Sequence, residues 1–212
     1  DNSRHLKLIS PLFNVLKITD EDKARNRMYL EQRKRTELKT QVGNLDEFLK
    51  QLNISVDIKN ADDFTIPRIS QLTLKTNQFN LTTRRYQEED IRKFVQGSEK
   101  IVGCAQIQDK FGDNGITGAY IINKDNEQQW TIDTFLLSCR VIGRGIEDGV
   151  LSHIIEKARK DGISQVRGEY IKTKKNQPAE NFFENFGFKK EGDFWIFDTK
   201  NQFKRPEHLV IS

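Results

Sequence analysis

Cysteine is scarce in this sequence, with two residues in 212, and long apolar runs are missing. Cys104 and Cys139 have neither CxxC nor zinc-site spacing, which argues against a disulfide framework and suggests a reducing compartment. The longest apolar runs, such as residues 132–137, fall far short of the roughly 18 residues that a membrane-spanning helix needs. No signal-peptide pattern opens the chain. These absences predict a cytoplasmic protein without a membrane partner.

The sequence also lacks a strong excess of charge of one sign. Lysine and arginine total 35 against 31 aspartates and glutamates, a formal net charge of +4. The signs are interleaved even in the basic stretch 23–39, so nucleic acid is not an expected partner. Acidic partners, including phosphates or an acidic carrier protein, are compatible with this balance. The three histidines are scattered, and no metal site is predicted.

The N-terminal third of the chain reads as helical and accessory. A capping-box-like pattern at Thr19 predicts a charged helix through about Thr40, and a second one at Asn44 predicts a helix over LDEFLKQL. A short strand, ISVDI, and another helix follow. Since the chain starts with Asp1 rather than methionine, we expect a fragment of a longer polypeptide. Residues 1–76 are expected to form a mainly helical extension.

From about residue 77 the pattern changes to strand signals. The expected order is a strand, a helix, three strands, a helix, a strand, a helix and a strand. The first two of the three central strands are expected to form a hairpin around FGDNG. This order predicts an α+β domain over residues 77–200, with helices packed on the sheet, and a tail over residues 201–212.

The stretch 138–158, SCRVIGRGIEDGVLSHIIEKA, reads as a strand end, a glycine turn and a helix. Such a junction presents free backbone N–H groups and the positive end of the helix dipole to one spot, where an anion fits. Gly143 and Gly145 leave room for a close approach, and Arg140 and Arg144 offer charged donors. An ordinary glycine turn without a ligand is the alternative.

The spacing of Arg140, Gly143 and Gly145 resembles the Q/R-x-x-G-x-G/A motif of the GNAT superfamily of N-acetyltransferases. The run NQPAENFFENFGF resembles the later signature of the same superfamily. The resemblance implies a mixed, mostly antiparallel sheet and a motif that cradles the pyrophosphate of coenzyme A or acetyl-CoA. It also implies that Asn176 contacts the cofactor.

Matching the helix instead of the first arginine changes the assignment at the third glycine of the motif. GRGIEDGVL then aligns with GKGIGxxLL, and Glu147 replaces a glycine. A carboxylate at this position would repel a pyrophosphate, so weak binding of coenzyme A is expected. Its spacing to Leu151, Ile154 and Ala158 directs Glu147 toward the buried face of the helix. A favourable charge in the first helical turn is the simpler interpretation.

Three segments, RISQLTLKTNQFNLTTRRY, IDTFLLSCRVIGRGIE and KTKKNQPAENFF, are similar to the C-terminal half of FkbH-like proteins. That family joins a haloacid-dehalogenase (HAD)-type phosphatase domain to an acetyltransferase-like domain. The resemblance implies a HAD-type domain as partner, and the handling of glyceryl or acyl thioesters on the phosphopantetheine of an acyl carrier protein in polyketide biosynthesis. The D-x-D-x-T/V motif of the phosphatase half is missing from this sequence.

Cys139 is the candidate nucleophile, because a strand end beside a helix N-terminus and two arginines lowers the pKa of a thiol. Cys104, inside IVGCAQI, is expected in the core. Asp133 is a candidate general base, as is Glu147, and strand alternation places Asp133 on one face with Phe135.

Three functions remain open from the sequence. The first is an acyltransferase that handles a carrier-bound thioester through Cys139. The second is acyl-CoA-dependent N-acyl transfer, and the third is a non-catalytic module that docks a carrier protein. For the active domain we expect the sheet to splay beside the glycine turn, leaving a groove lined by Arg140, Gly143, Gly145 and Asn176.

Overall fold

The computed structural model describes residues 20–212, with side chains from Asn26 onward, and its chain divides into two compact units. The described part of the first unit is helix α1 (Asp20–Val42), which confirms the predicted charged helix. Within it Arg27 pairs with Glu31, with Nε and Oε1 2.9 Å apart. The predicted cap at Thr19 lies outside the described residues.

The second unit, Asn44–Ser212, is built on a mixed sheet in the order β7-β8-β6-β5-β4-β3-β1-β9, with β2 paired to β5. Neighbouring strands are antiparallel except for β5 with β6 and β1 with β9. This mostly antiparallel α+β arrangement is the predicted fold class. The strands are β1 (Ile54–Asn60), β2 (Phe79–Asn80), β3 (Lys100–Asp109), β4 (Gly112–Asn126), β5 (Gln129–Leu137), β6 (Gln165–Glu169), β7 (Lys189–Glu191), β8 (Phe194–Asp198) and β9 (Leu209–Ile211).

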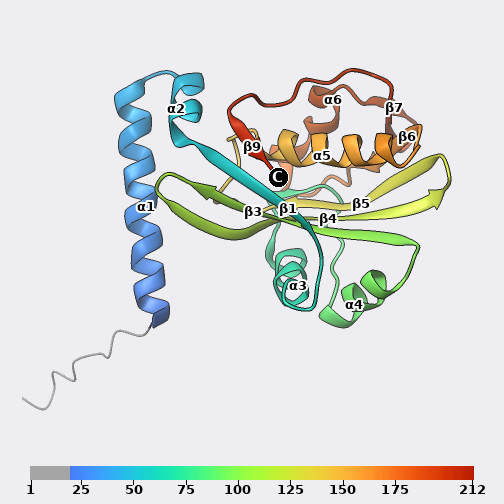
Figure 1. Ribbon diagram of the computed structural model, residues 1–212, viewed down its shortest axis with the longest axis horizontal. Coiled ribbons are helices and arrows are strands. Elements are labelled where there is room, and N and C mark those ends of the chain that lie inside the picture. The colour runs from blue at the N-terminus through green and yellow to red at the C-terminus, as the bar shows by residue number, and fades with distance from the viewer. Residues whose placement is uncertain (1–19) are drawn as a thin grey trace, which may run out of the picture. The chain divides into compact units, whose positions relative to one another are not determined.

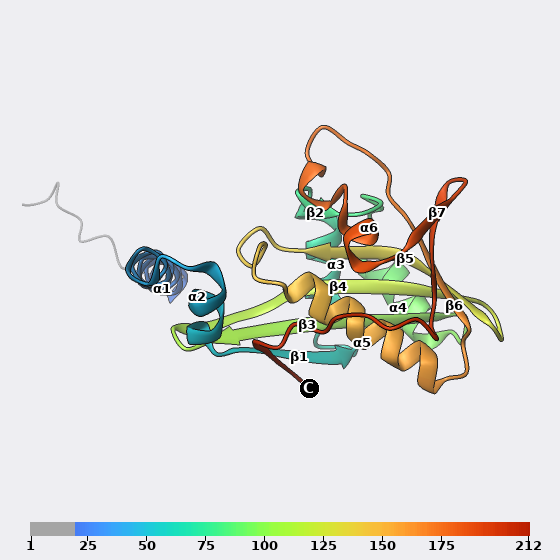
Figure 2. The ribbon, with the colours of Figure 1, turned by 90° about the horizontal axis from the view of Figure 1, so that it is seen from above.

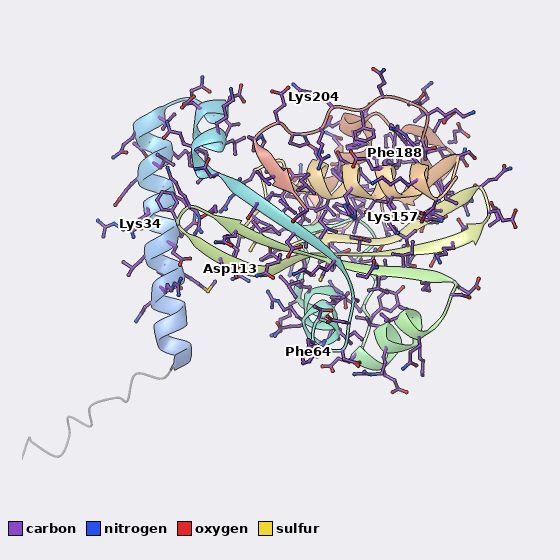
Figure 3. The ribbon with its side chains drawn as sticks, in the orientation of Figure 1. Lys34, Phe64, Asp113, Lys157, Phe188 and Lys204 are labelled. Atoms are coloured by element: carbon purple, nitrogen blue, oxygen red, sulfur yellow. The ribbon has the colours of Figure 1, made fainter. Side chains whose placement is uncertain are left out.

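Helices cover both faces of this sheet. Figure 1 shows α5 and α6 on one face and α3 and α4 on the other, and Phe64 and Lys157 mark these opposite sides in Figure 3. The helices of the unit are α2 (Leu45–Leu52), α3 (Ile66–Lys75), α4 (Glu88–Gln96), α5 (Ile146–Lys160) and α6 (Phe182–Phe186), with a short 3-10 helix η1 (Gln177–Ala179).

The sheet extends beyond the predicted range 77–200 at both ends. Strand β1 pairs with β3, placing Val56 opposite Ile107, and β9 pairs in parallel with β1, placing Ile211 beside Val56. The segment expected as an extension and the segment expected as a tail therefore both contribute strands. Strand β9 has only three residues, too few for an alternating pattern to reveal it.

Each face of the sheet buries its own apolar cluster. The α3–α4 face packs aliphatic side chains, including Ile69, Ile91 and Ile121. On the other face, aromatic rings pack around α6, and the rings of Phe183 and Phe188 lie 4.8 Å apart. Seen from above, β2 lies next to α6 (Figure 2).

Two predicted elements differ in detail from the structure. The hairpin between β3 and β4 turns at residues 110–111, so most of FGDNG belongs to β4. The predicted helix over PAENFFENF is divided into η1 and α6. Gly187, with φ +107°, ends α6 as expected, because this conformation is free of steric cost only for glycine.

Gly168 tests the packing of the aromatic cluster. A Cβ atom at this position would lie 2.4 Å from Cζ of Phe183. We expect Gly168→Ala to lower the free energy of unfolding by roughly 1–3 kcal/mol, because the enclosed ring has little room to move. The control is Gly97→Ala, whose new Cβ would meet its nearest atom at 3.4 Å. Urea denaturation should separate the two variants, and equal stabilities would contradict this packing.

Candidate functional site

The turn between β5 and α5 has the predicted strand, turn and helix geometry. Gly143 and Gly145 adopt φ angles of +77° and +72°, which side chains would disfavour, and Gly145 is the N-cap of α5. The amide of Ser138 donates to the carbonyl of Thr117 at 2.7 Å and ties the start of the turn to β4. The prediction of a glycine turn that leads into a helix is therefore confirmed for the backbone.

Arg144 serves the interior of the fold rather than an open anion site. Its Nη1 lies 3.1 Å from Oδ2 of Asp109, and Nη2 donates to the carbonyl of Arg140 at 2.8 Å. The side chains of Arg144 and Asp109 are 9% and 0% exposed. Arg140 is half-buried, with its Nε 3.4 Å from Oγ of Ser138. Asp109 precedes Arg144 by 35 residues, and no sequence motif links the two. The fold alone brings them together, so the pair could not be predicted from the sequence.

The carboxyl group of Glu147 lies in the first turn of α5. Burial raises the pKa of Glu147 to about 7, while the backbone amides of Glu147 and Gly143 act in the opposite direction. Oε2 is buried without a hydrogen-bond partner among the described residues. Burial also raises the pKa of Asp148. The expected inward direction of Glu147 agrees with the burial of its Oε2.

The C-terminal segment packs over the glycine turn. Nε2 of His208 lies 2.7 Å from the carbonyl oxygen of Arg144, and a Cβ on Gly145 would meet the His208 ring at 3.2 Å. A pocket of about 450 Å³ adjoins this contact and includes Lys50 and Lys204 in its lining. Sequence reasoning placed His208 in a tail and missed this contact, because the segment carries no motif.

The two cysteines have different environments. Cys139 is exposed in the turn, whereas Cys104 is buried in the α3–α4 cluster, as predicted. Burial raises the pKa of the Cys104 thiol to about 11. Of the two arginines that were expected beside the Cys139 thiol, Arg144 directs its guanidinium to Asp109. Cys139 is thus exposed, and the guanidinium of Arg144 is paired with Asp109; the role of Cys139 as a nucleophile stays a prediction.

Strands β5 and β6 splay apart beyond a short paired stretch, but without the predicted groove. They pair in parallel only from Gln129 with Gln165 to Ile132 with Gly168. At this point β5 has a bulge at Asp133, because Ile132 and Thr134 pair with consecutive residues of β4. Beyond the bulge, β5 continues to Leu137 without β6.

The chain itself fills this splay, with a segment that we call the insert (residues 79–84). Phe79 and Asn80 pair with β5 in antiparallel register, and the amide of Leu81 donates to the carbonyl of Phe135 at 3.1 Å. On the other side, the amide of Ile171 donates to the carbonyl of Leu81 at 2.8 Å. The insert thus lies as an extra strand between β5 and the chain that follows β6, and no open groove remains there.

Asn176 holds the insert in place. This side chain is fully buried, and its Nδ2 donates to the carbonyls of Asn80 and Ile171, each at 3.0 Å. Its Oδ1 accepts from the amide of Thr173 at 2.8 Å. The prediction of a groove that joins Asn176 to Arg140, Gly143 and Gly145 is therefore wrong for this conformation. The side-chain amide of Asn176 forms its hydrogen bonds within the chain itself.

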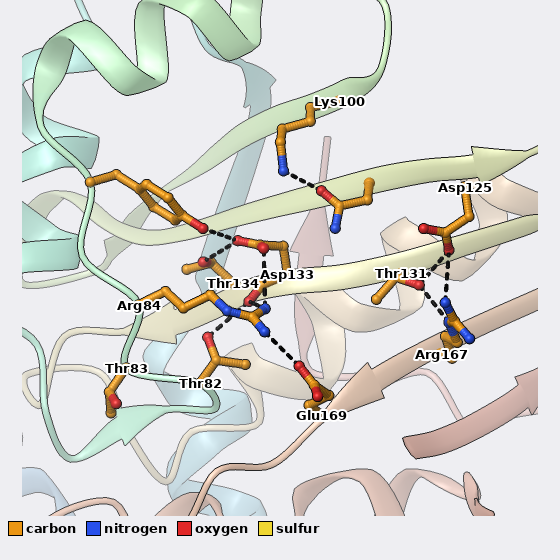
Figure 4. Close-up of polar contacts among 12 residues, drawn as sticks. Thr82, Thr83, Arg84, Lys100, Asp125, Thr131, Asp133, Thr134, Arg167 and Glu169 are labelled. Carbon is orange, nitrogen blue, oxygen red and sulfur yellow. Dashed lines mark hydrogen bonds and ion pairs between the residues drawn. The ribbon is translucent and has the colours of Figure 1, made fainter. Parts of the chain in front are cut away.

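Asp133 anchors the same segment (Figure 4). Its Oδ1 lies 3.1 Å from Nη1 of Arg84, and its Oδ2 accepts from the hydroxyls of Tyr86 and Thr134 at 2.8 and 2.9 Å. Nη2 of Arg84 reaches Oε2 of Glu169 on β6 at 2.6 Å. Burial and the bond to Asp133 raise the pKa of Tyr86. Hydrogen bonds to protein groups thus engage both carboxylate oxygens of Asp133, and the role of this residue as a general base stays a prediction.

The bulge explains why strand alternation misplaced Asp133. An extra residue in one strand changes the face to which neighbouring side chains point. Asp133 and Thr134 hydrogen-bond to each other, and Asp133 meets Tyr86, which packs edge-on against Phe94 of α4. The sequence placed Asp133 with Phe135, whose ring packs against Phe182 of α6.

Thr83 has a strained backbone inside the insert. Its φ of +54° is unusual for a β-branched residue and costs about 1–3 kcal/mol. The amide of Thr83 donates to Oδ1 of Asn80 at 2.9 Å, which supports the conformation locally. Such strain persists only where surrounding contacts enforce it.

Comparisons with protein-family models and with curated protein sequences found no match. Among solved structures, a GNAT-family protein from Desulfovibrio desulfuricans has a TM-score of 0.54 at 14% identity, over 68% of this chain and 99% of that chain. Ribosomal-protein-S18-alanine N-acetyltransferase from Escherichia coli has a TM-score of 0.51 at 15% identity, over 66% of this chain and 90% of that chain. N-acetylglutamate synthase from Neisseria gonorrhoeae, complexed with coenzyme A and N-acetyl-glutamate, has a TM-score of 0.52 at 18% identity, over 68% of this chain and 35% of that chain.

The chain therefore has the α+β fold of the GNAT acetyltransferases. At these identities the likeness concerns the fold. The comparisons give no support to the FkbH-like resemblance or to a HAD-type context. In the described part of the chain, no helix is long and apolar enough to cross a membrane. No group of three or more metal-ligating side chains occurs among the same residues.

The titration of Glu147 should be visible in the pH dependence of stability. Its pKa of about 7 in the folded protein exceeds the ordinary value of 4.5, so the folded state binds the proton more tightly. The stabilising contribution is complete below the ordinary pKa and is lost as the pH rises through 7. Between about pH 5 and 8 the parent should lose roughly 1–3 kcal/mol more than Glu147→Gln. Urea denaturation across this range tests it, and parallel curves would contradict the buried carboxyl.

Proposed function

We propose that this domain is an acyltransferase that takes its acyl group from a phosphopantetheine thioester, with acyl-CoA as the soluble donor. The observation that carries the proposal is the junction of β5, the glycine turn and α5, which stands beside a splayed pair of parallel strands on the GNAT fold. Backbone N–H groups at such a helix N-terminus suit the phosphates of the donor. The carboxyl ends of parallel strands are a favoured place for ligands in open sheets.

The described conformation does not fit this donor in two respects. The insert uses the edge of β5 along which an extended arm would lie, since Leu81 and Asn80 already pair there. The carboxyl group of Glu147 lies in the first turn of α5 with its Oε2 buried, where its charge would oppose a phosphate. Donor binding therefore requires the insert to leave β5 and the charge of Glu147 to be neutralised or moved.

Cys139 is the residue for which a covalent role is proposed. In that role its sulfur attacks the thioester carbonyl, the carbon–sulfur bond of the donor breaks, and the donor thiol leaves with the proton that Cys139 gives up. The acyl group then passes from Cys139 to the thiol of an acceptor phosphopantetheine by the same exchange, in which the Cys139 thiol is released with the proton of the acceptor thiol. Because one thioester replaces another, the exchange is nearly balanced in energy. Exposure of the thiol at the turn supports this role. Direct transfer from acyl-CoA to an amine, with a structural Cys139, is the form that the comparisons favour.

An acyl or glyceryl group carried by an acyl carrier protein is the finer form of the proposal. Its support is the FkbH-like resemblance of the sequence, together with a mixed and slightly basic charge that suits an acidic partner. The HAD-type phosphatase domain of such a protein would supply the loaded donor. The carrier's phosphopantetheine offers the same arm as coenzyme A, so the same end of the sheet would receive it.

A non-catalytic docking module is the second candidate, and the insert favours it. A sheet edge that is hydrogen-bonded on both sides and fixed by the buried Asn176 resembles a completed fold rather than an open site. In that case the chain would recruit a carrier protein without binding the donor arm.

Affinity for coenzyme A tests the proposed donor site. Removing the carboxyl group in Glu147→Ala should tighten binding about tenfold, because a buried like charge no longer opposes the phosphates. Calorimetry of the full chain with coenzyme A measures this. The control is Asp148→Asn, which removes the neighbouring acid of the same helical turn. If the effect of Glu147 depends on its place at the turn amides, this control should change the affinity less than about threefold. Equal effects of both variants, or none, would contradict the role of Glu147.

Intact-mass measurement after incubation with acyl-CoA or acyl carrier protein tests Cys139. The relay predicts a labile adduct of one acyl group that disappears in Cys139→Ser and persists in Cys104→Ala. Full transfer activity in Cys139→Ser would exclude the covalent role and leave direct transfer. Absence of both adduct and transfer would favour the docking module.

A further inference from the structure

The edge of β5 beyond the bulge has a single set of main-chain donors and acceptors. Leu136 and Leu137 use them to pair with Asn80 and Phe79, and Phe135 accepts from the amide of Leu81. An extended ligand that adds to a strand edge needs these same groups. It can therefore bind only after the insert has left β5.

Two features of the insert, a short pairing with β5 and a strained residue, favour its displacement. Its regular pairing with β5 covers two residues, whereas β3 and β4 pair over most of their length. Thr83 holds a left-handed backbone, φ +54°, that is unusual for a β-branched residue. Strained residues of this kind concentrate at clamps and switches, where surrounding contacts enforce the conformation. Release of the insert would relieve this strain.

Side chains at the end of the insert supply the fastening. Arg84 bridges the two splayed strands, with Nη1 3.1 Å from Asp133 on β5 and Nη2 2.6 Å from Glu169 on β6. Thr82 adds a hydrogen bond of 2.8 Å from its hydroxyl to the carbonyl of Asp133. The Arg84 side chain is 35% exposed and Glu169 is 24% exposed, so water and solutes reach this bridge (Figure 4). The bridge is the part of the fastening that solvent reaches, whereas Phe79, Asn80, Leu81 and Thr82 are buried, so opening also moves these residues out of the core.

We infer that the insert is a latch over the donor site, held closed by the bridge from Arg84 to Asp133 and Glu169. The identity of the ligand behind the latch rests on the proposed function, but the latch itself rests on the contacts of the insert. In the closed form the domain keeps β5 paired. In the open form it exposes the edge from Asp133 to Leu137 beside the glycine turn.

Amide hydrogen exchange on the full chain tests the latch without any ligand. In Arg84→Gln the amides of Leu81 and Ile171 should exchange at least about tenfold faster than in the parent, because charge-assisted bonds are lost. The matched control is Arg167→Gln. Arg167 also bridges from β6 toward β5, donating to Oγ1 of Thr131 at 2.7 Å, but where the two strands remain paired. This control should leave the exchange of Leu81 and Ile171 unchanged.

Glu169→Gln provides a second variant that removes one arm of the bridge and leaves the buried Asp133 in place. It should accelerate the same two amides in the same direction, and it decides the question if Arg84→Gln fails to fold. Unchanged exchange in the folded variants, or equal acceleration in Arg167→Gln, would overturn the latch.

Calorimetry with coenzyme A on the same variants separates the two proposals. Faster exchange together with tighter binding supports both the latch and the donor site. Faster exchange without binding leaves the latch standing and contradicts the acyl-CoA donor. Tighter binding without faster exchange contradicts the latch alone.

Discussion

The open edge of β5 is the constraint on which this end of the molecule depends. The pairing of β5 with β6 ends at Ile132. Beyond this residue the N–H and C=O groups of β5 would be buried without hydrogen-bond partners, which would lower the stability of the fold. The insert satisfies them, and Arg84 and Asn176 fasten the insert to both sides of the splay. These residues thereby complete the sheet.

At the glycine turn, too, contacts within the chain engage the groups that could bind a ligand. Its backbone has the form that binds anions, yet Arg144 is buried on Asp109, His208 packs over Gly145, and Oε2 of Glu147 is buried in the first turn of α5. The domain combines an acetyltransferase fold with a glycine turn whose neighbours are engaged within the chain, and the central question is whether the proposed donor site opens.

Local sequence patterns predicted much of the framework. The glycines at 143 and 145, the helix α5, the buried Cys104 and the inward Glu147 follow from spacing and conformational preference, which act over a few residues. The patterns failed where contacts join distant segments. Leu81 bonds to Ile171, and Arg84 bonds to Asp133, so the position of the insert depends on chain topology rather than on local sequence. The bulge at Asp133 likewise depends on β4.

Locking the insert tests the central claim most directly. Asn80 and Leu136 are cross-strand partners, about 5 Å apart at Cα, which suits a disulfide between cysteines placed at both positions. Coenzyme A binding by calorimetry is then compared between the oxidised and reduced forms of this variant. The account predicts binding in the reduced form and its loss, by at least about tenfold, on oxidation. Equal binding in both forms, or none in either, would contradict it.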